Sequence, residues 1–124
     1  MPPRPFLHGL HLIADLAAHE RLDDPDFIGA VLRDAAAAAK VTLLELRLHH
    51  FGEGSGVTGV ALLAESHISI HTWPEDDLAA VDIFVCGAQA DPEAALTEIT
   101  SALAAKVLKV ARIERLAGSI PDTN

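Results

Sequence analysis

Four strand-length segments follow one another between residues 41 and 86, and they constrain the fold more than any other feature of the chain. In the first segment Leu44, Leu46 and Leu48 alternate with polar residues, which is the period of two typical of a half-buried strand. The other three cover residues 57–64, 68–73 and 79–86, and polar turns separate them. This order predicts an antiparallel meander.

Two helices are predicted around this meander, one before it and one after it. Each begins with an Asp-Pro pair, at residues 24–25 and 91–92, in which aspartate caps the helix and proline fits its first turn. Apolar residues then recur at helical spacing in both segments. With strand-like segments at residues 9–16 and 108–116, the predicted order is β-α-β-β-β-β-α-β.

This order predicts an α+β protein in which two helices pack on one face of an antiparallel sheet. A chain of 124 residues is long enough to bury a real core, so we expect a single domain over residues 1–124. The opposite face of the sheet must then lie in solvent or against a partner.

Charge and cysteine content argue against several classes of function. The net charge of −9, with lysine and arginine dispersed, argues against nucleic acid as a partner, because phosphates require a basic surface. No apolar run approaches the about 20 residues that a membrane span needs, and the chain begins with no signal-peptide pattern. The single cysteine, Cys86, leaves no internal disulfide. We therefore expect a cytoplasmic protein that binds neither nucleic acid nor membrane.

Residues 64–75 concentrate an acid, a hydroxyl, two imidazoles and the only tryptophan. Ser66 would become a nucleophile if His67 or His71 took its proton. A Gly-x-Ser-x-Gly elbow is absent, so ordinary hydrolase chemistry is disfavoured. On a regular strand Ser66 and His71 face opposite sides, so they can meet only if the backbone breaks or bulges around Glu65-Ser66. A strained peptide there would be consistent with that bond reacting.

A metal site is a competing interpretation. Nitrogen and sulfur ligands could come from His49, His50, His67, His71 and Cys86. The spacing of His67 and His71 brings two ligands onto one face of a helix, whereas this segment has the pattern of a strand, so we predict no metal. Ordinary interpretations also exist for the single residues: Cys86 as a small buried hydrophobic residue, Trp73 and Phe51 as packing residues, Thr58 as a strand residue and Glu75 as a solvated carboxylate.

A longer pattern points to a family. Residues 65–75 read Glu-Ser-His-Ile-Ser-Ile-His-Thr-Trp-Pro-Glu, with Gly-Val-Thr-Gly-Val at 56–60 before them and Ala-Ala-Val-Asp-Ile-Phe-Val-Cys-Gly at 79–87 after them. This segment closely resembles the short prokaryotic S-adenosylmethionine decarboxylase proenzymes. A weaker similarity runs from residue 9 to about residue 116.

The resemblance implies that the chain cuts itself between Glu65 and Ser66 and makes its own pyruvoyl cofactor. In the family the serine hydroxyl attacks the preceding carbonyl, and elimination and hydrolysis then turn the serine into a pyruvoyl group. Residues 1–65 would become the β chain and residues 66–124 the α chain. The substrate amine would form a Schiff base with the pyruvoyl ketone, which takes up the electrons left when CO₂ departs.

The family's site roles can be carried over residue by residue. By resemblance, His71 is the proton donor or base in processing, Thr58 is the hydroxyl that assists it (commonly a serine), and Cys86 is the proton donor in catalysis. Phe51 and Trp73 are candidates to contact the adenine and the sulfonium of S-adenosylmethionine, and Glu75 to bind the ribose or the cation. The product would be S-adenosylmethioninamine, the aminopropyl donor for spermidine synthesis. Family members pair as homodimers with αββα layers and active sites near the interface, and they are not regarded as metal-dependent.

Three departures from the family pattern leave alternatives open. An aromatic-glycine-aromatic triplet usual in the family is Asp76-Asp77-Leu78 here, the loop between Phe51 and Thr58 is one residue longer, and Leu10 replaces a basic residue. The added carboxylates would favour a more basic substrate, so a pyruvoyl-dependent arginine or ornithine decarboxylase is one alternative. A non-processing paralogue that dimerises with or regulates a true decarboxylase is another.

Overall fold

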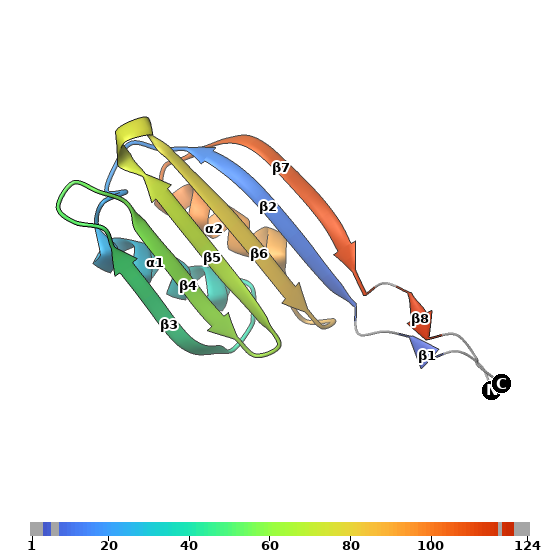
Figure 1. Cartoon of the computed structure of the whole chain (residues 1–124). Helices are drawn as coiled ribbons and strands as arrows, with labels where there is room; N and C mark the ends of the chain where they lie inside the picture. Colours follow the sequence, from blue (N-terminus) through green and yellow to red (C-terminus); the bar gives the residue numbers. More distant parts are fainter. Residues whose placement is uncertain (1–3, 6–7, 117, 121–124) are drawn as a thin grey trace.

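The computed structural model describes residues 4–5, 8–116 and 118–120. Its main sheet has six antiparallel strands in the order β3-β4-β5-β6-β2-β7 (Figure 1). These strands are β2 (Gly9–Ala17), β3 (Leu43–His50), β4 (Val57–Leu63), β5 (Ser66–Trp73), β6 (Leu78–Cys86) and β7 (Lys106–Arg115). The four meander strands lie side by side in chain order, which confirms the predicted antiparallel meander.

Helices α1 (Pro25–Ala38) and α2 (Pro92–Ala102) pack together on one face of this sheet (Figure 1). The Asp24 side chain accepts a hydrogen bond from the amide of Phe27 at 3.1 Å, and Asp91 accepts one from the amide of Ala94 at 3.0 Å. Both contacts satisfy amide groups that the first helical turn leaves unpaired. The predicted α+β class and both Asp-Pro helix starts are therefore confirmed.

The core lies between the helices and the sheet. Alternate residues of the central strands point into it, so that Ile68, Ile70 and Ile83 are at most 1% exposed. From the helix side come Ile28, Leu32 and Ile99, none of which is exposed. Burial of these side chains is the main contribution to stability, at roughly 1.5–3 kcal/mol each.

The edge strand β3 departs from the predicted alternation. Leu44 is 67% exposed, although the pattern places it on the same side as Leu46 and Leu48. The pairing of β3 with β4 shifts between Leu43 and Glu45, which leaves Leu44 as the extra residue of a bulge. Leu43 packs against the core in its place, so the prediction for Leu44 is wrong.

The sheet face opposite the helices, called the open face below, carries the side chains that alternate with the core residues. Large apolar side chains on it are exposed, among them Ile13 at 40%, Leu62 at 42% and Ile113 at 44%. The described part of the chain leaves this face uncovered (Figure 1).

Three smaller elements, two strands and a 3-10 helix, complete the described structure. Strand β1 (Arg4–Pro5) pairs with β8 (Ser119–Ile120) in a separate antiparallel ladder near the two chain ends (Figure 1). A short 3-10 helix, η1 (Pro74–Asp76), joins β5 to β6. None of the helices in the described ranges is both long and apolar enough to cross a membrane.

Candidate active site

The bond between Glu65 and Ser66 lies in the tight turn that joins β4 to β5. Leu63 and Ser66 are paired, so Ala64 and Glu65 form a two-residue loop. Glu65 has a φ of 66°, in the left-handed region that is costly for residues other than glycine. The strand is therefore interrupted at the predicted position, and the residue before the bond has a strained backbone. The Ser66 hydroxyl donates to the Ala64 carbonyl at 3.3 Å.

His71 and Thr58 meet at the far end of the same hairpin. They are cross-strand partners on β5 and β4, and the Thr58 hydroxyl lies 3.0 Å from Nδ1 of His71. The ring of Trp73 lies 6.2 Å from the ring of His71. Together they border a cavity of about 400 Å³ lined by Phe51, Ser55, Gly56, Thr58, His71, Thr72, Trp73 and Glu75. All three predicted substrate-binding residues therefore line one cavity together with Thr58 and His71.

The shape of this cavity depends on two residues that the sequence interpretation missed. The hydroxyl of Thr72 accepts from the amide of Val57 at 2.8 Å and donates to the carbonyl of Leu22 at 2.6 Å, which ties β4, β5 and the β2–α1 loop together. A Cβ atom on Gly56 would lie 2.0 Å from the carbonyl oxygen of Thr72, so only glycine allows this close approach. Gly56, which directly precedes Val57, was the one sequence feature that could have predicted this close approach.

Cys86 lies at the opposite end of the sheet from this cavity. It pairs with Gly9 on β2, and a Cβ atom at Gly9 would lie 2.9 Å from the thiol sulfur, so the bare glycine makes room for the thiol. Burial raises the pKa of the Cys86 thiol, and the negative charge of Glu65 raises it further. A raised pKa keeps the thiol protonated near neutral pH, as a proton donor requires.

The candidate residues thus form two groups at opposite ends of β5. Ser66 begins the strand, close to Glu65 and Cys86, while His71 lies five positions further along, about 16 Å away at the usual rise of a strand. The protomer brings Thr58 and His71 together but does not bring Ser66 to His71. Among the described residues, no cluster of three or more His, Cys, Asp or Glu side chains is arranged to hold a metal ion.

Comparison with known proteins gives consistent matches over most of the chain. The sequence model of the S-adenosylmethionine decarboxylase family matches residues 10–116. A protein of Prochlorococcus marinus (strain MIT 9313) named S-adenosylmethionine decarboxylase proenzyme is 50% identical over 79% of this chain and 79% of its own length. A protein of Thermomicrobium roseum with the same name is 39% identical over 92% of this chain and 97% of its own.

A solved structure resembles the fold as a whole. The crystal structure of the adenosylmethionine decarboxylase from Aquifex aeolicus VF5 superposes with a TM-score of 0.77. It is 33% identical in sequence, and the match covers 97% of this chain and 98% of that chain.

Proposed function

Because this chain belongs to the S-adenosylmethionine decarboxylase family, we propose that it cuts itself between Glu65 and Ser66 and then decarboxylates S-adenosylmethionine. The proenzymes of this family carry a pyruvoyl group that they derive from their own chain, and here residue 66 would become that group. Residues 1–65 become the β chain and residues 66–124 the α chain of a single cytoplasmic domain.

The strained turn at Glu65 is the observation that carries the self-cleavage. The Ser66 hydroxyl attacks the carbonyl carbon of Glu65, and the peptide bond becomes an ester as the amine of residue 66 is released. Removal of the α-proton of residue 66 then expels the Glu65 carboxylate, and water replaces the nitrogen as ammonia to leave the ketone. Breaking this bond also releases the left-handed backbone of Glu65, which stores about 1–2 kcal/mol.

The sheet topology keeps the two products together after the cut. The β chain supplies β2, β3, β4 and α1, and the α chain supplies β5, β6, β7 and α2. Strand β2 lies between β6 and β7, while β4 stays paired with β5, so each chain is hydrogen-bonded to the other along several strands.

A second copy of the chain completes the site. A lone protomer keeps Ser66 and Cys86 at the opposite end of the sheet from His71, and its open face leaves Ile13, Leu62 and Ile113 in water. In the proposed dimer the two open faces pack against each other, related by a two-fold axis that runs between them and perpendicular to the strands. This symmetry sets the Ser66 end of one protomer against the His71 end of its partner. The homodimer is then an αββα sandwich with two composite sites.

Within each composite site the residues have distinct tasks. His71, held by Thr58, moves protons during processing. The pyruvoyl group supplies the electron sink that lets the substrate lose CO₂. Cys86, whose raised pKa keeps the thiol protonated, gives its proton to the α-carbon after CO₂ has left.

The cavity has the chemistry that S-adenosylmethionine requires. Phe51 and Trp73 are 63% and 44% exposed, so their rings are free to stack on adenine or to face the sulfonium cation. A cation over such a ring gains about 0.5–2 kcal/mol. Glu75 on the same cavity is placed to bind the ribose hydroxyls or the cation.

One observation bears on the alternative of a more basic substrate, arginine or ornithine. Asp77 has a left-handed φ of 56°, and its carbonyl accepts a hydrogen bond from the amide of Ala18 at 3.0 Å. The residue therefore forms part of the turn between η1 and β6. Aspartate is one of the few residues besides glycine that adopt this conformation readily. Asp77 thus replaces the family's glycine for a conformational reason, which weakens it as a mark of changed substrate.

Intact mass of the purified protein tests the proposal. We expect two fragments divided before residue 66, and an α chain that reacts with a hydrazine because it begins with a ketone. CO₂ release is then measured from S-adenosylmethionine, arginine and ornithine, with Ser66→Ala as the uncut control. A wild-type chain that stays whole would defeat the proposal in favour of a non-processing paralogue, and turnover of arginine or ornithine alone would refute the substrate.

A further inference from the structure

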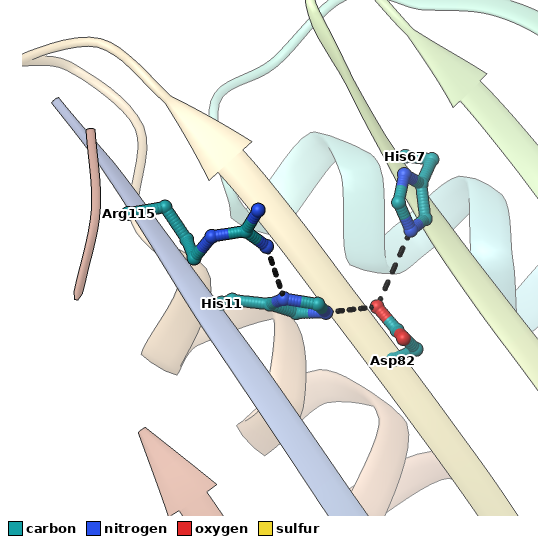
Figure 2. Close-up of polar contacts among 4 residues, drawn as sticks. All are labelled: His11, His67, Asp82 and Arg115. Atoms are coloured by element: carbon teal, nitrogen blue, oxygen red, sulfur yellow. Dashed lines mark hydrogen bonds and ion pairs between the residues drawn. The ribbon is translucent and has the colours of Figure 1, made fainter. Parts of the chain in front are cut away.

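Four polar residues on the open face form a connected cluster across four neighbouring strands (Figure 2). One carboxylate oxygen of Asp82 on β6 lies 2.7 Å from Nε2 of His11 on β2 and 3.3 Å from Nε2 of His67 on β5. On the other side of His11, its Nδ1 lies 3.2 Å from a guanidinium nitrogen of Arg115 on β7. None of the roles assigned above uses this cluster.

The donors and acceptors in the cluster have only one consistent arrangement. Arginine can only donate, so Nδ1 of His11 accepts from Arg115, and His11 carries its proton on Nε2. That N–H donates to Asp82, which as a carboxylate only accepts, and His67 therefore donates to Asp82 as well. Both imidazoles point at the same oxygen in Figure 2. Asp82 is thus the common acceptor that ties β2 and β5 to β6.

His67 is the residue directly after Ser66, which makes this cluster a support for the reacting end of β5. Before cleavage the turn through Glu65 holds position 66 covalently. Once the Glu65–Ser66 bond is cut, residue 66 becomes a chain end, and chain ends fray unless side chains hold them. The contact of His67 with Asp82 is the first side-chain hydrogen bond that β5 makes beyond the cut.

The packing around His67 supports the same role. Phe84, the cross-strand partner of both His11 and His67, lies between them, with ring centroids 5.3 Å and 6.1 Å away. Arg115 covers the Phe84 ring at 5.3 Å. The His11 side chain is only 16% exposed, so its position is well defined by packing. Its contact with Asp82 therefore holds in place the carboxylate that His67 also contacts.

We propose that Asp82 is a positioning residue that holds the pyruvoyl-bearing end of β5 after self-cleavage, by accepting a hydrogen bond from His67. This inference rests on the proposed function. It predicts that loss of the contact impairs turnover, which uses the free end, far more than processing, which occurs while the turn is intact. The KM is expected to change less than twofold, because none of the four cluster residues lines the cavity proposed to bind the substrate.

The test compares four variants: His67→Leu, Asp82→Ala, the double variant, and His67→Gln, whose side-chain amide keeps a donor at a similar reach. Each kcat is measured per pyruvoyl group, titrated with a hydrazine, and the processing rate is followed separately by intact mass. We expect about a tenfold loss of kcat in each single variant, which is within the about 100-fold that a misplacement of about 1 Å can cost. The double variant should lose no more than Asp82→Ala alone, because that change has already removed the contact with His67. His67→Gln should recover most of the loss.

His19→Leu is the matched control, since His19 is an exposed residue between β2 and α1. Three results would overturn the inference: unchanged kcat in His67→Leu, losses that multiply in the double variant, or equal losses of processing and turnover. Failure of the proposed function is distinguishable from these, because the wild-type chain would then contain no pyruvoyl group.

Discussion

At the scale of single residues, Glu65 is the position where backbone conformation bears most directly on chemistry. A left-handed φ is needed to close the two-residue loop between β4 and β5, and glycine would supply it without cost. Glutamate in its place leaves the peptide before Ser66 under strain, so part of the cost of the proposed cleavage is already present in the folded chain.

Glycine at position 65 should therefore slow self-cleavage. Glu65→Gly relieves about 1 kcal/mol in the precursor, which corresponds to about a fivefold lower processing rate if the strain is lost in the transition state. The rate is measured by intact mass after rapid refolding. Ala64→Gly is the control, because the neighbouring Ala64 is not in the left-handed region and gains no relief. Faster cleavage in Glu65→Gly would contradict this role of strain.

Cys86 should give the pH profile of turnover its alkaline limb. A proton donor must be protonated, so kcat stays level below the pKa of the thiol and falls as the pH rises through it. Burial and the charge of Glu65 raise that pKa, so the fall should lie above the ordinary thiol value of about 8.5.

Two variants check this assignment, with kcat of the processed enzyme measured between about pH 7 and about pH 10. Glu65→Gln removes the nearby negative charge and should move the fall to lower pH. Cys86→Ala should still process, lose most of its turnover and show no alkaline fall in what remains. An unchanged fall in Cys86→Ala would assign it to another group.

At the scale of elements, the β4–β5 hairpin connects the two groups of proposed active-site residues. Its turn holds Ser66, and its open end holds the contact between Thr58 and His71. The hydroxyl of Thr58 fixes the orientation of the imidazole, while the methyl group adds only packing.

Removal of that hydroxyl should slow processing without unfolding the hairpin. Thr58→Val keeps the shape of the side chain and loses the hydrogen bond. We expect about a tenfold lower cleavage rate, less than the about 100-fold or more that a proton-transfer group itself contributes, because His71 is still present. Thr58→Ser restores the hydroxyl and should process at close to the wild-type rate. Equal rates in the valine and serine variants would show that only packing matters at this position.

Sequence patterns predicted the elements that have a regular repeat of buried residues or a local start signal. They missed features that depend on single contacts without any repeat. The meander and both helix starts follow from alternation and from Asp-Pro pairs, because each produces a local signal. The bulge at Leu44 was missed because an inserted residue leaves the apolar composition unchanged. The pairing of β1 with β8 was missed because two-residue strands have no period. Thr72 was missed because a buried hydroxyl with several backbone partners has the same letter as a surface threonine.

The site shows the same limit at longer range. The side-chain alternation of β5 already separated Ser66 from His71 by face, and the interruption at Glu65 was expected from it. Strand length then separates the two residues by position as well. No local pattern indicates which surface would close this gap, because the proposed pairing of two protomers depends on the whole open face.

At the scale of the whole molecule, Ser66 and His71 lie at opposite ends of the sheet. In the proposed dimer this separation predicts a specific pattern of complementation between protomers. If Ser66 of one protomer uses His71 of its partner, a mixed dimer of Ser66→Ala and His71→Ala contains one intact site and one doubly altered site. Coexpression of the two, with tags of different mass, should therefore yield a cut His71→Ala chain and an uncut Ser66→Ala chain. If each protomer served its own Ser66, neither chain would be cut beyond the level of His71→Ala alone.

Cys86 sharpens this test because it lies at the Ser66 end of the sheet and so belongs to the same protomer's half-site. A mixed dimer of Ser66→Ala and Cys86→Ala should cut the Cys86→Ala chain, since Ser66 and the partner's His71 are both intact. That same site lacks its thiol, so the dimer should release CO₂ no faster than Cys86→Ala alone. Restored turnover in this mixture would mean that the proton crosses from the other protomer, and the proposed arrangement of the two open faces would have to be abandoned.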